Sequence, residues 1–169
     1  AREIDAALPI ELSREEQIRL VREYCSSQFV SKGMCVDFAI HDTDSGNPHC
    51  HIMLTMRPLD ERGAWAAKSK KEYDLDENGE RIRLPNGRYK THKVDLTGWN
   101  DKGNALLWRK AWADISNSYL ERAGSTERID HRSNAERGID EIPTVHMGVA
   151  ACQMEKKGIA TEKGELNRN

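Results

Sequence analysis

Residues 34–57, which read MCVDFAIHDTDSGNPHCHIMLTMR, contain the pattern that decides the fold. Two apolar, β-prone runs, 34–41 and 49–56, flank the seven residues DTDSGNP, nearly all of which favour turns. This arrangement predicts two antiparallel strands joined by a turn, that is, a β-hairpin.

Three histidines lie on this predicted hairpin. His49 and His51 are two residues apart, so their side chains project from one face of the strand, and His41 ends the strand that precedes them. Neutral imidazole binds divalent transition metals, and three protein ligands with an open coordination position are typical of a catalytic site. The sequence therefore predicts a three-histidine metal site. One alternative is that the histidines are solvated or hydrogen-bonded and bind no metal. Another is a closed structural zinc site that also uses Cys35 or Cys50, although strand alternation places Cys50 on the other face.

Composition sets limits on the kind of protein. A chain of 169 residues, 37% hydrophobic and 32% charged, predicts a single α+β domain with exposed polar parts. It contains no apolar run near 18 residues and no signal-like stretch, which predicts a cytoplasmic protein without membrane spans. The net charge of −2 is unusual for a nucleic-acid-binding domain, so any DNA-binding surface is expected to be local.

Further elements are expected around the hairpin. Alternation over residues 2–8 predicts a strand, and the capping box formed by Ser13 and Glu16 predicts a helix that extends to about residue 29. A second helix is expected after Asn100 as N-cap, through residue 120, and a last one over 145–156. Together they indicate a central antiparallel sheet with helices packed on it.

Two carboxylates of the first strand, Glu3 and Asp5, share a face. If this strand neighbours the hairpin, either can orient a metal-bound histidine by accepting its second ring N–H. The alternative is that both belong to the solvated side of a half-buried strand.

Basic and aromatic residues after the hairpin are candidates for binding single-stranded DNA. Trp65 lies near several lysines, which suits base stacking with phosphate contacts, although a loop anchor is an equal alternative. Residues 73–94 predict a β-ribbon with turns at 76–79 and 85–87, which either follows phosphates or is a solvated hairpin. The predicted DNA-binding residues are Trp65, Lys68, Lys70, Lys71, Arg81, Arg83, Arg88, Lys90, His131 and Arg132.

These motifs resemble the MobA/MobL family of plasmid mobilisation relaxases, a branch of the HUH single-strand endonucleases. The segments that carry the resemblance span nearly the whole chain: ALPIELSREEQ (7–17), AIHD (39–42), GNPHCHIMLTMRPL (46–59), AKSKKEYDLDENGERI (67–82), WNDKG (99–103), WRKAWAD (108–114), ERIDHRS (127–133) and IPTVHMGVAACQMEKKGI (142–159). The resemblance implies a palm-like sheet related to that of rolling-circle initiators. It also implies that His41, His49 and His51 bind Mn²⁺ or Mg²⁺ in function, with Zn²⁺ or Ni²⁺ as the ions a crystal can retain, and that Glu3 or Asp5 lies beside them.

The implied activity is the nicking and rejoining of one DNA strand at the origin of transfer (oriT), by transesterification to a tyrosine. The implied partners are single-stranded DNA at oriT and other relaxosome proteins. The family's nucleophilic tyrosine precedes the first strand of this chain, and none of the four tyrosines here matches its position. We therefore expect residues 1–160 to form a relaxase domain without its N-terminal strand and tyrosine-bearing segment, which would be a separate or cleaved peptide, and residues 161–169 to be a polar tail or the start of a linker.

Three other functions compete with this interpretation. A rolling-circle replication initiator would use Tyr119, on the second helix, as its nucleophile. A DNA-binding fragment stabilised by a metal would lack catalysis. A metal-dependent hydrolase would use a bound hydroxide and leave a free 5′-phosphate.

Overall fold

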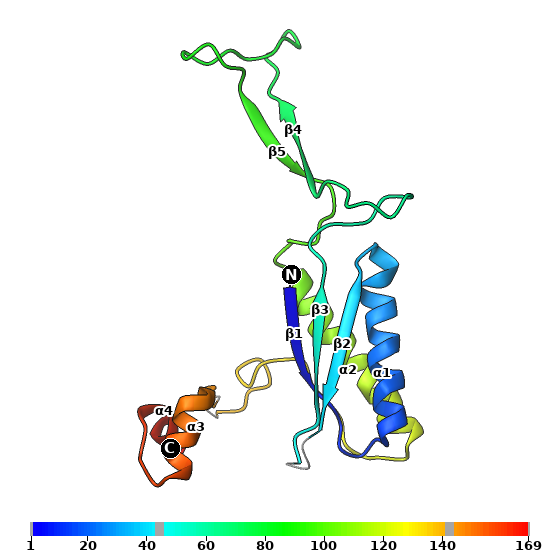
Figure 1. Cartoon of the computed structure of the whole chain (residues 1–169), viewed down its shortest axis with the longest axis vertical. Helices are drawn as coiled ribbons and strands as arrows, with labels where there is room; N and C mark the ends of the chain where they lie inside the picture. The colour runs from blue at the N-terminus through cyan, green and yellow to red at the C-terminus, as the bar shows by residue number, and fades with distance from the viewer. Residues whose placement is uncertain (1, 43–45, 141–143, 169) are drawn as a thin grey trace. The chain divides into compact units, whose positions relative to one another are not determined.

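The computed structural model describes residues 2–42, 46–140 and 144–168. The chain divides into two compact units, Ala1–His131 and Arg132–Asn169. The first contains a three-stranded antiparallel sheet, two long helices and a two-stranded ribbon, and the second contains two short helices (Figure 1). This architecture confirms the predicted α+β class with a central antiparallel sheet.

The central sheet has the strand order β1-β3-β2, in which β1 is Arg2–Ala7, β2 is Val36–His41 and β3 is His49–Leu54. Both pairings are antiparallel, so the predicted hairpin of β2 and β3 is confirmed and β1 completes the sheet on the other side of β3. Residues 43–45 of the predicted turn lie outside the described part of the chain.

Alternation along the three strands gives the sheet two different faces. On β3, Cys50, Ile52 and Leu54 are buried, whereas His49 and His51 are half-buried and Met53 is exposed. The same alternation on β1 and β2 turns Ile4 and Phe38 towards the core and leaves the intervening side chains outside it. We call the second side the open face; its residues are Glu3, Asp5, Ala7, Asp37, Ala39, His41, His49, His51 and Met53.

Helix α1 (Arg14–Gln28) packs on the core face of the sheet. Ser13 caps it by the predicted capping box, in which its hydroxyl accepts the N–H of Glu16 and the Glu16 carboxylate bonds back to Ser13. The 3₁₀ helix η1 (Val30–Lys32) follows, and Gly33, with φ of 86°, adopts the left-handed conformation that releases the chain towards β2.

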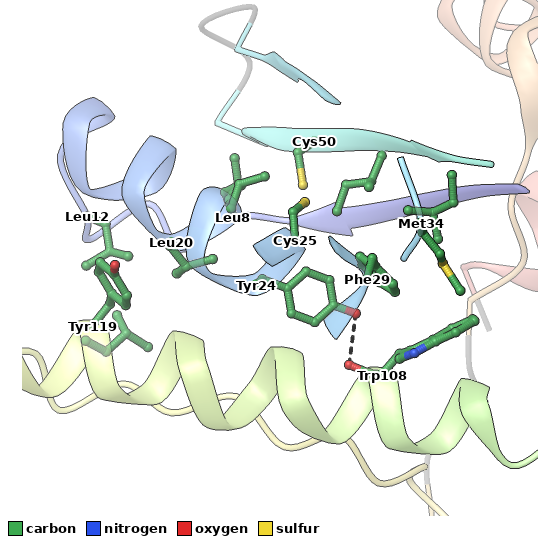
Figure 2. Close-up of a cluster of buried hydrophobic side chains, with 14 of the residues drawn as sticks. Leu8, Leu12, Leu20, Tyr24, Cys25, Phe29, Met34, Cys50, Trp108 and Tyr119 are labelled. Atoms are coloured by element: carbon green, nitrogen blue, oxygen red, sulfur yellow. Dashed lines mark hydrogen bonds between the residues drawn. The ribbon is translucent and has the colours of Figure 1, made fainter. Parts of the chain in front are cut away.

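Helix α2 (Asn104–Arg122) packs against α1, and the two share the main core with the sheet (Figure 2). The Tyr24 hydroxyl of α1 donates to the carbonyl oxygen of Trp108 at 3.1 Å, as the dashed line shows. The prediction of Asn100 as the N-cap was wrong, because the Asn100 side chain instead accepts a hydrogen bond from Arg2 at 3.1 Å. A turn held by the Asp101 carboxylate intervenes, and Gly103 becomes the N-cap.

The ribbon consists of β4 (Ser69–Tyr73) and β5 (Thr91–Asp95), which pair antiparallel. Beyond the strands, isolated bridges between Leu75 and Arg81 and between Arg83 and Tyr89 close two separate turns. Because β4 starts at Ser69, the ribbon begins four residues before the predicted start at residue 73. The lysine-rich start of β4 has no apolar alternation, because neither side of the ribbon packs on the main core.

The second unit contains α3 (Gly148–Lys156) and α4 (Glu162–Leu166). Helix α3 starts three residues after the predicted position, and α4 lies in the segment predicted as a polar tail, where Thr161 caps it. The domain boundary at residue 160 stays a prediction. Among the described residues, the helices all fall short of the length and apolar character that a membrane crossing requires.

Candidate metal centre

The three histidines meet at one end of the β2–β3 hairpin. His41 and His49 are directly paired across the two strands, and His51 projects from the same face two residues along β3. Their ring centroids are 4.8 to 5.5 Å apart. One ring nitrogen of each lies within 4.8 Å of the others, so the predicted convergence is confirmed.

Hydrogen bonds fix the tautomers of two of these rings. Nδ1 of His49 lies 2.9 Å from the carbonyl oxygen of Asn47, which can only accept, so this nitrogen carries the proton. Nδ1 of His51 lies 2.7 Å from a carboxylate oxygen of Asp5 and is likewise the donor. In the neutral form both rings therefore keep the Nε2 lone pair free for a metal ion.

Strand register explains why Asp5 reaches His51. The N–H of Leu8 bonds to the carbonyl of Pro48, so the alternating pattern makes Asp5 and His51 a non-hydrogen-bonded pair, whose side chains lie closer together. Glu3, one position along the same face, places Oε1 3.3 Å from the same ring nitrogen. Both predicted carboxylates thus lie beside the histidine cluster, and Asp5 makes the shorter contact.

The donor set fits a divalent transition metal. Three neutral imidazoles at this spacing can share one ion after small side-chain rotations, and the exposed edge at His41 leaves room for another ligand. The alternative with cysteine ligands is wrong for Cys50, whose fully buried thiol points to the core face and towards Cys25 (Figure 2). Burial raises the pKa of the Cys50 thiol to about 11, the opposite of what a metal-bound thiolate needs.

The residues predicted to bind DNA are distributed over several places. Trp65 is 55% exposed and lines a hollow of about 540 Å³ with Met53 and Asp37 of the open face. Lys68 precedes β4, and the ribbon carries Lys70, Lys71, Arg81, Arg83, Arg88 and Lys90. Two of these, Lys70 and Lys90, are in ion pairs with Glu72 and Asp74. His131 ends the first unit and Arg132 begins the second.

A second cavity, a groove of about 720 Å³, runs along β1. Glu3, Asp5 and His131 all line it. Its lining also includes Trp99 and Arg109, which the sequence analysis missed as site residues. Their only sequence signal is the spacing of tryptophans and basic residues around the start of α2. That signal is indistinguishable from an ordinary packing helix without knowledge of the strand that α2 faces.

None of the four tyrosines lies on the open face, and all four are in the described residues. Tyr24 and Tyr119 are buried in the helical layer, where the Tyr119 hydroxyl donates to Glu23 at 2.9 Å. Tyr73 and Tyr89 belong to the ribbon and contact each other edge to face.

The antiparallel sheet, with three converging histidines on one hairpin and two carboxylates on the adjoining strand, defines an α+β domain with a candidate metal centre. The chain belongs to the MobA/MobL family, which it matches over residues 1–157. The resemblance found in the sequence motifs is thereby confirmed.

Relatives and a solved structure support this membership. The chain is 34% identical over 184 residues to a probable mobilization protein MobA of Bifidobacterium longum, with 99% of this chain and 32% of that protein covered. It is 37% identical over 172 residues to a conjugal transfer protein TraA of Rhizobium radiobacter, with 99% and 15% covered. A solved structure described as the molecular basis of vancomycin resistance transfer in Staphylococcus aureus superposes with a TM-score of 0.59 at 30% identity, over 78% of this chain and 56% of that one. The chain thus spans a third or less of these two relatives.

Proposed function

We propose that this chain is the metal-binding part of a DNA relaxase that nicks and rejoins one strand at the oriT of a plasmid and so initiates conjugative mobilisation. The observation that carries the proposal is the convergence of His41, His49 and His51, two of which have their Nε2 lone pairs set by hydrogen bonds. Family membership supports a role in plasmid mobilisation, since the relatives are named mobilization and conjugal transfer proteins.

The three histidines would hold a divalent ion, Mn²⁺ or Mg²⁺ in function, although Zn²⁺ or Ni²⁺ binds imidazole at least as well. When bound, such an ion supplies a Lewis acid that polarises the non-bridging oxygens of the scissile phosphate. Asp5 and Glu3 hold the proton of His51 on Nδ1, so that its Nε2 lone pair is the one available to the ion. The chain's own contribution is therefore a set of oriented neutral imidazoles.

The proposed reaction is a transesterification. A tyrosine oxygen attacks the phosphorus, forms a 5′-phosphotyrosyl bond and releases a 3′-hydroxyl, and the reverse attack by that hydroxyl rejoins the strand. We propose that this tyrosine lies outside the 169 residues. The engagement of all four internal tyrosines in the core or the ribbon supports this, and in particular the burial of Tyr119 disfavours the rolling-circle alternative.

The open face offers a path for a single strand leading away from the histidines. Met53 follows His51 on that face, and the exposed ring of Trp65 lines the hollow beyond it. Bases can stack on such a ring while nearby lysines contact phosphates. Trp65 and Lys68 are therefore the proposed guides of the strand, and relaxosome proteins at oriT are proposed partners.

A covalent-adduct assay tests the proposal. The protein, with its natural upstream sequence, is incubated with Mn²⁺ and a 3′-labelled oligonucleotide spanning the oriT of its plasmid, and the mixture is boiled in detergent. We expect the labelled 3′ fragment to migrate with the protein. A His49→Ala/His51→Ala variant should abolish the adduct, and His92→Ala, on the ribbon, should not.

Other products would identify a competing function. A free 5′-phosphate would indicate a hydrolase, and an intact strand that binds the protein only with metal would indicate a non-catalytic DNA-binding module. Either result contradicts the relaxase proposal.

A further inference from the structure

The hollow that Trp65 lines on the open face combines apolar walls with two opposite charges, and we call it the open-face hollow. Met53, Met56 and Trp65 give it exposed or half-buried apolar surface, and its volume is about 540 Å³. Asp37 and Arg57 line the same cavity. A cavity of this size, with apolar walls and few polar groups, is the usual form of a small-ligand site.

The loop after β3 holds Trp65 in place. Trp65 forms an isolated bridge with Leu59 across this loop. The turn between them is closed by the Asp60 carboxylate, which accepts the N–H groups of Arg62 and Ala64 at 2.9 and 2.8 Å. The exposed ring is therefore carried by an ordered turn, so a ligand that stacks on it has little of the chain left to order.

The two charged residues of the open-face hollow are not paired with each other. Among the described residues, the Asp37 carboxylate has no hydrogen-bond or ion-pair partner, and Arg57 forms no ion pair. Arg57 uses Nε to donate to the carbonyl oxygen of Ala66 at 3.1 Å, which leaves its terminal nitrogens available as donors. The hollow thus offers a ligand one strong acceptor and one strong donor.

Strand geometry places the open-face hollow close to the histidines. At about 3.3 Å per residue, Met53 lies about 7 Å from His51 along β3, and Asp37 lies about 13 Å from His41 along β2. Asp37 and Met53 are cross-strand partners, so both paths end at the same level of the sheet. A single strand with one phosphate at the histidines can therefore place a nearby base in the hollow.

The lining of the hollow favours a base over a phosphate. A phosphate would face the Asp37 carboxylate beside apolar walls, where like charges repel more strongly than in water. A nucleobase is uncharged and flat, so it can stack on Trp65 while its edge meets the polar groups. Proteins commonly recognise unpaired bases in this way, by stacking and by hydrogen bonds to the Watson–Crick edge.

Guanine complements the two polar groups better than the other bases do. Its Watson–Crick edge carries neighbouring N–H groups on N1 and N2 beside the acceptor O6. One carboxylate can accept from both N–H groups, and a guanidinium can donate to O6. Adenine and cytosine present a single amino group on this edge, and thymine presents one N–H between two carbonyls.

We propose that the open-face hollow binds one unpaired guanine of the single strand, with Asp37 accepting from N1 and N2, Arg57 donating to O6, and Trp65 stacking on the base. The proposal deepens the proposed function, on which it rests, because it assigns part of the sequence specificity for the strand to Asp37. The histidine site would act on the phosphate, and the hollow would set which strand is bound there.

Single-base changes in a short DNA strand test this assignment. The probes are fluorescein-labelled strands of about 12 nucleotides, a length within the usual range for single-strand-binding sites. One contains thymine only, and the other three contain a single central guanine, adenine or cytosine. Affinity for the protein with its natural upstream sequence is measured by anisotropy in EDTA, so that metal plays no part. A bidentate contact to a base discriminates by about 10-fold, so the guanine strand should bind about 10-fold more tightly than the others.

Variants then locate the preference. Asp37→Asn should remove most of it, because an amide oxygen accepts only one of the two N–H groups, and should leave the all-thymine strand bound at least as tightly. Glu61→Gln is the charge-matched control, since it removes a carboxylate from the loop that carries Trp65 but lies outside the lining, and it should keep the preference. Trp65→Ala should weaken binding of all four strands, and Trp65→Phe should retain most of it.

Equal affinities for the four strands would overturn the proposal, and so would tighter binding of the adenine or cytosine strand. A guanine preference that survives in Asp37→Asn would also overturn it. Circular dichroism checks the fold of each variant.

Base preference is measured separately from the metal chemistry. A His49→Ala/His51→Ala variant should keep the guanine preference while losing metal binding and the covalent adduct, and Asp37→Asn should keep metal binding. A guanine preference without any adduct in the unsubstituted protein would count against the proposed function alone. An adduct without a guanine preference would count against the role of the hollow alone.

Discussion

Nδ1 of His51 lies 2.7 Å from Oδ1 of Asp5, across the β1–β3 pairing. The contact joins a residue near the start of the chain to the central strand of the sheet, and it fixes which nitrogen of His51 is free. Because a carboxylate partner fixes the tautomer and orientation of a ligand histidine, the pair is expected to strengthen metal binding.

Asp5→Ala should weaken Mn²⁺ binding by about 10- to 100-fold, the usual effect of losing the hydrogen-bond partner of a ligand histidine. Isothermal titration of the purified chain with MnCl₂ measures the change. Glu3→Ala should have a smaller effect, since its contact with His51 is 3.3 Å. Asp37→Ala is the matched control, because this carboxylate shares the open face and pairs with Met53 rather than with a histidine. Unchanged affinity in Asp5→Ala would contradict the assigned role.

Metal should stabilise the folded chain, since a site built from two strands is absent from the unfolded state. A concentration of 100 times the dissociation constant adds about 2.7 kcal/mol to the free energy of unfolding. The unfolding temperature in MnCl₂ should therefore exceed that in EDTA. His41→Ala should remove most of the difference, whereas His92→Ala should retain it. A metal-induced rise that survives in His41→Ala would place the ion elsewhere.

Tyr119→Phe separates the relaxase from the rolling-circle initiator. Tyr119 is buried against α1 and its hydroxyl donates to Glu23 at 2.9 Å, so the substitution should lower the free energy of unfolding by about 1 kcal/mol. Urea denaturation measures this loss. The covalent adduct with the oligonucleotide should form as in the unsubstituted protein. Disappearance of the adduct without unfolding would identify Tyr119 as the nucleophile.

The sequence predicted the histidine hairpin well because local signals determine it. Turn-forming residues between two β-prone runs imply antiparallel pairing, and a side-chain period of two places His49 and His51 together. The capping box at Ser13 was equally local and was also confirmed. Such features need no information about distant parts of the chain.

Features that depend on distant residues could not be predicted. The choice between Asp5 and Glu3 follows from the register between β1 and β3, which the order of residues in either strand does not reveal. Asn100 resembles an N-cap locally, but Arg2 engages its side chain from 98 positions away. The cross-strand pairing of Lys71 with Lys93 likewise depends on the register between β4 and β5.

Alkaline pH should destabilise the fold through two buried thiols. Burial raises the pKa of Cys25 to about 12 and that of Cys50 to about 11, whereas an unfolded cysteine ionises near pH 8.5. Above that pH the unfolded chain loses protons that the folded chain retains, so stability is full below about pH 8.5 and declines as the pH rises towards the folded-state values. At pH 10 the ionisation of each thiol in the unfolded chain should lower the free energy of unfolding by about 2 kcal/mol relative to neutral pH.

Urea denaturation in reducing buffer at pH 7.5, 8.5, 9.25 and 10 measures this decline. Cys25→Ala and Cys50→Ala should each be less stable than the unsubstituted chain at neutral pH, because each removes buried atoms. In each variant, however, the free energy of unfolding should fall less steeply with pH in the alkaline range. Cys152→Ala is the control, since that thiol is exposed on α3 and its removal should leave the slope unchanged. The burial of Tyr24 also raises the pKa of its hydroxyl, so some decline should remain above pH 10 even without both thiols. A flat profile between pH 8.5 and 10 in the unsubstituted chain would show that water reaches the space between α1 and β3, where the two thiols point towards each other (Figure 2).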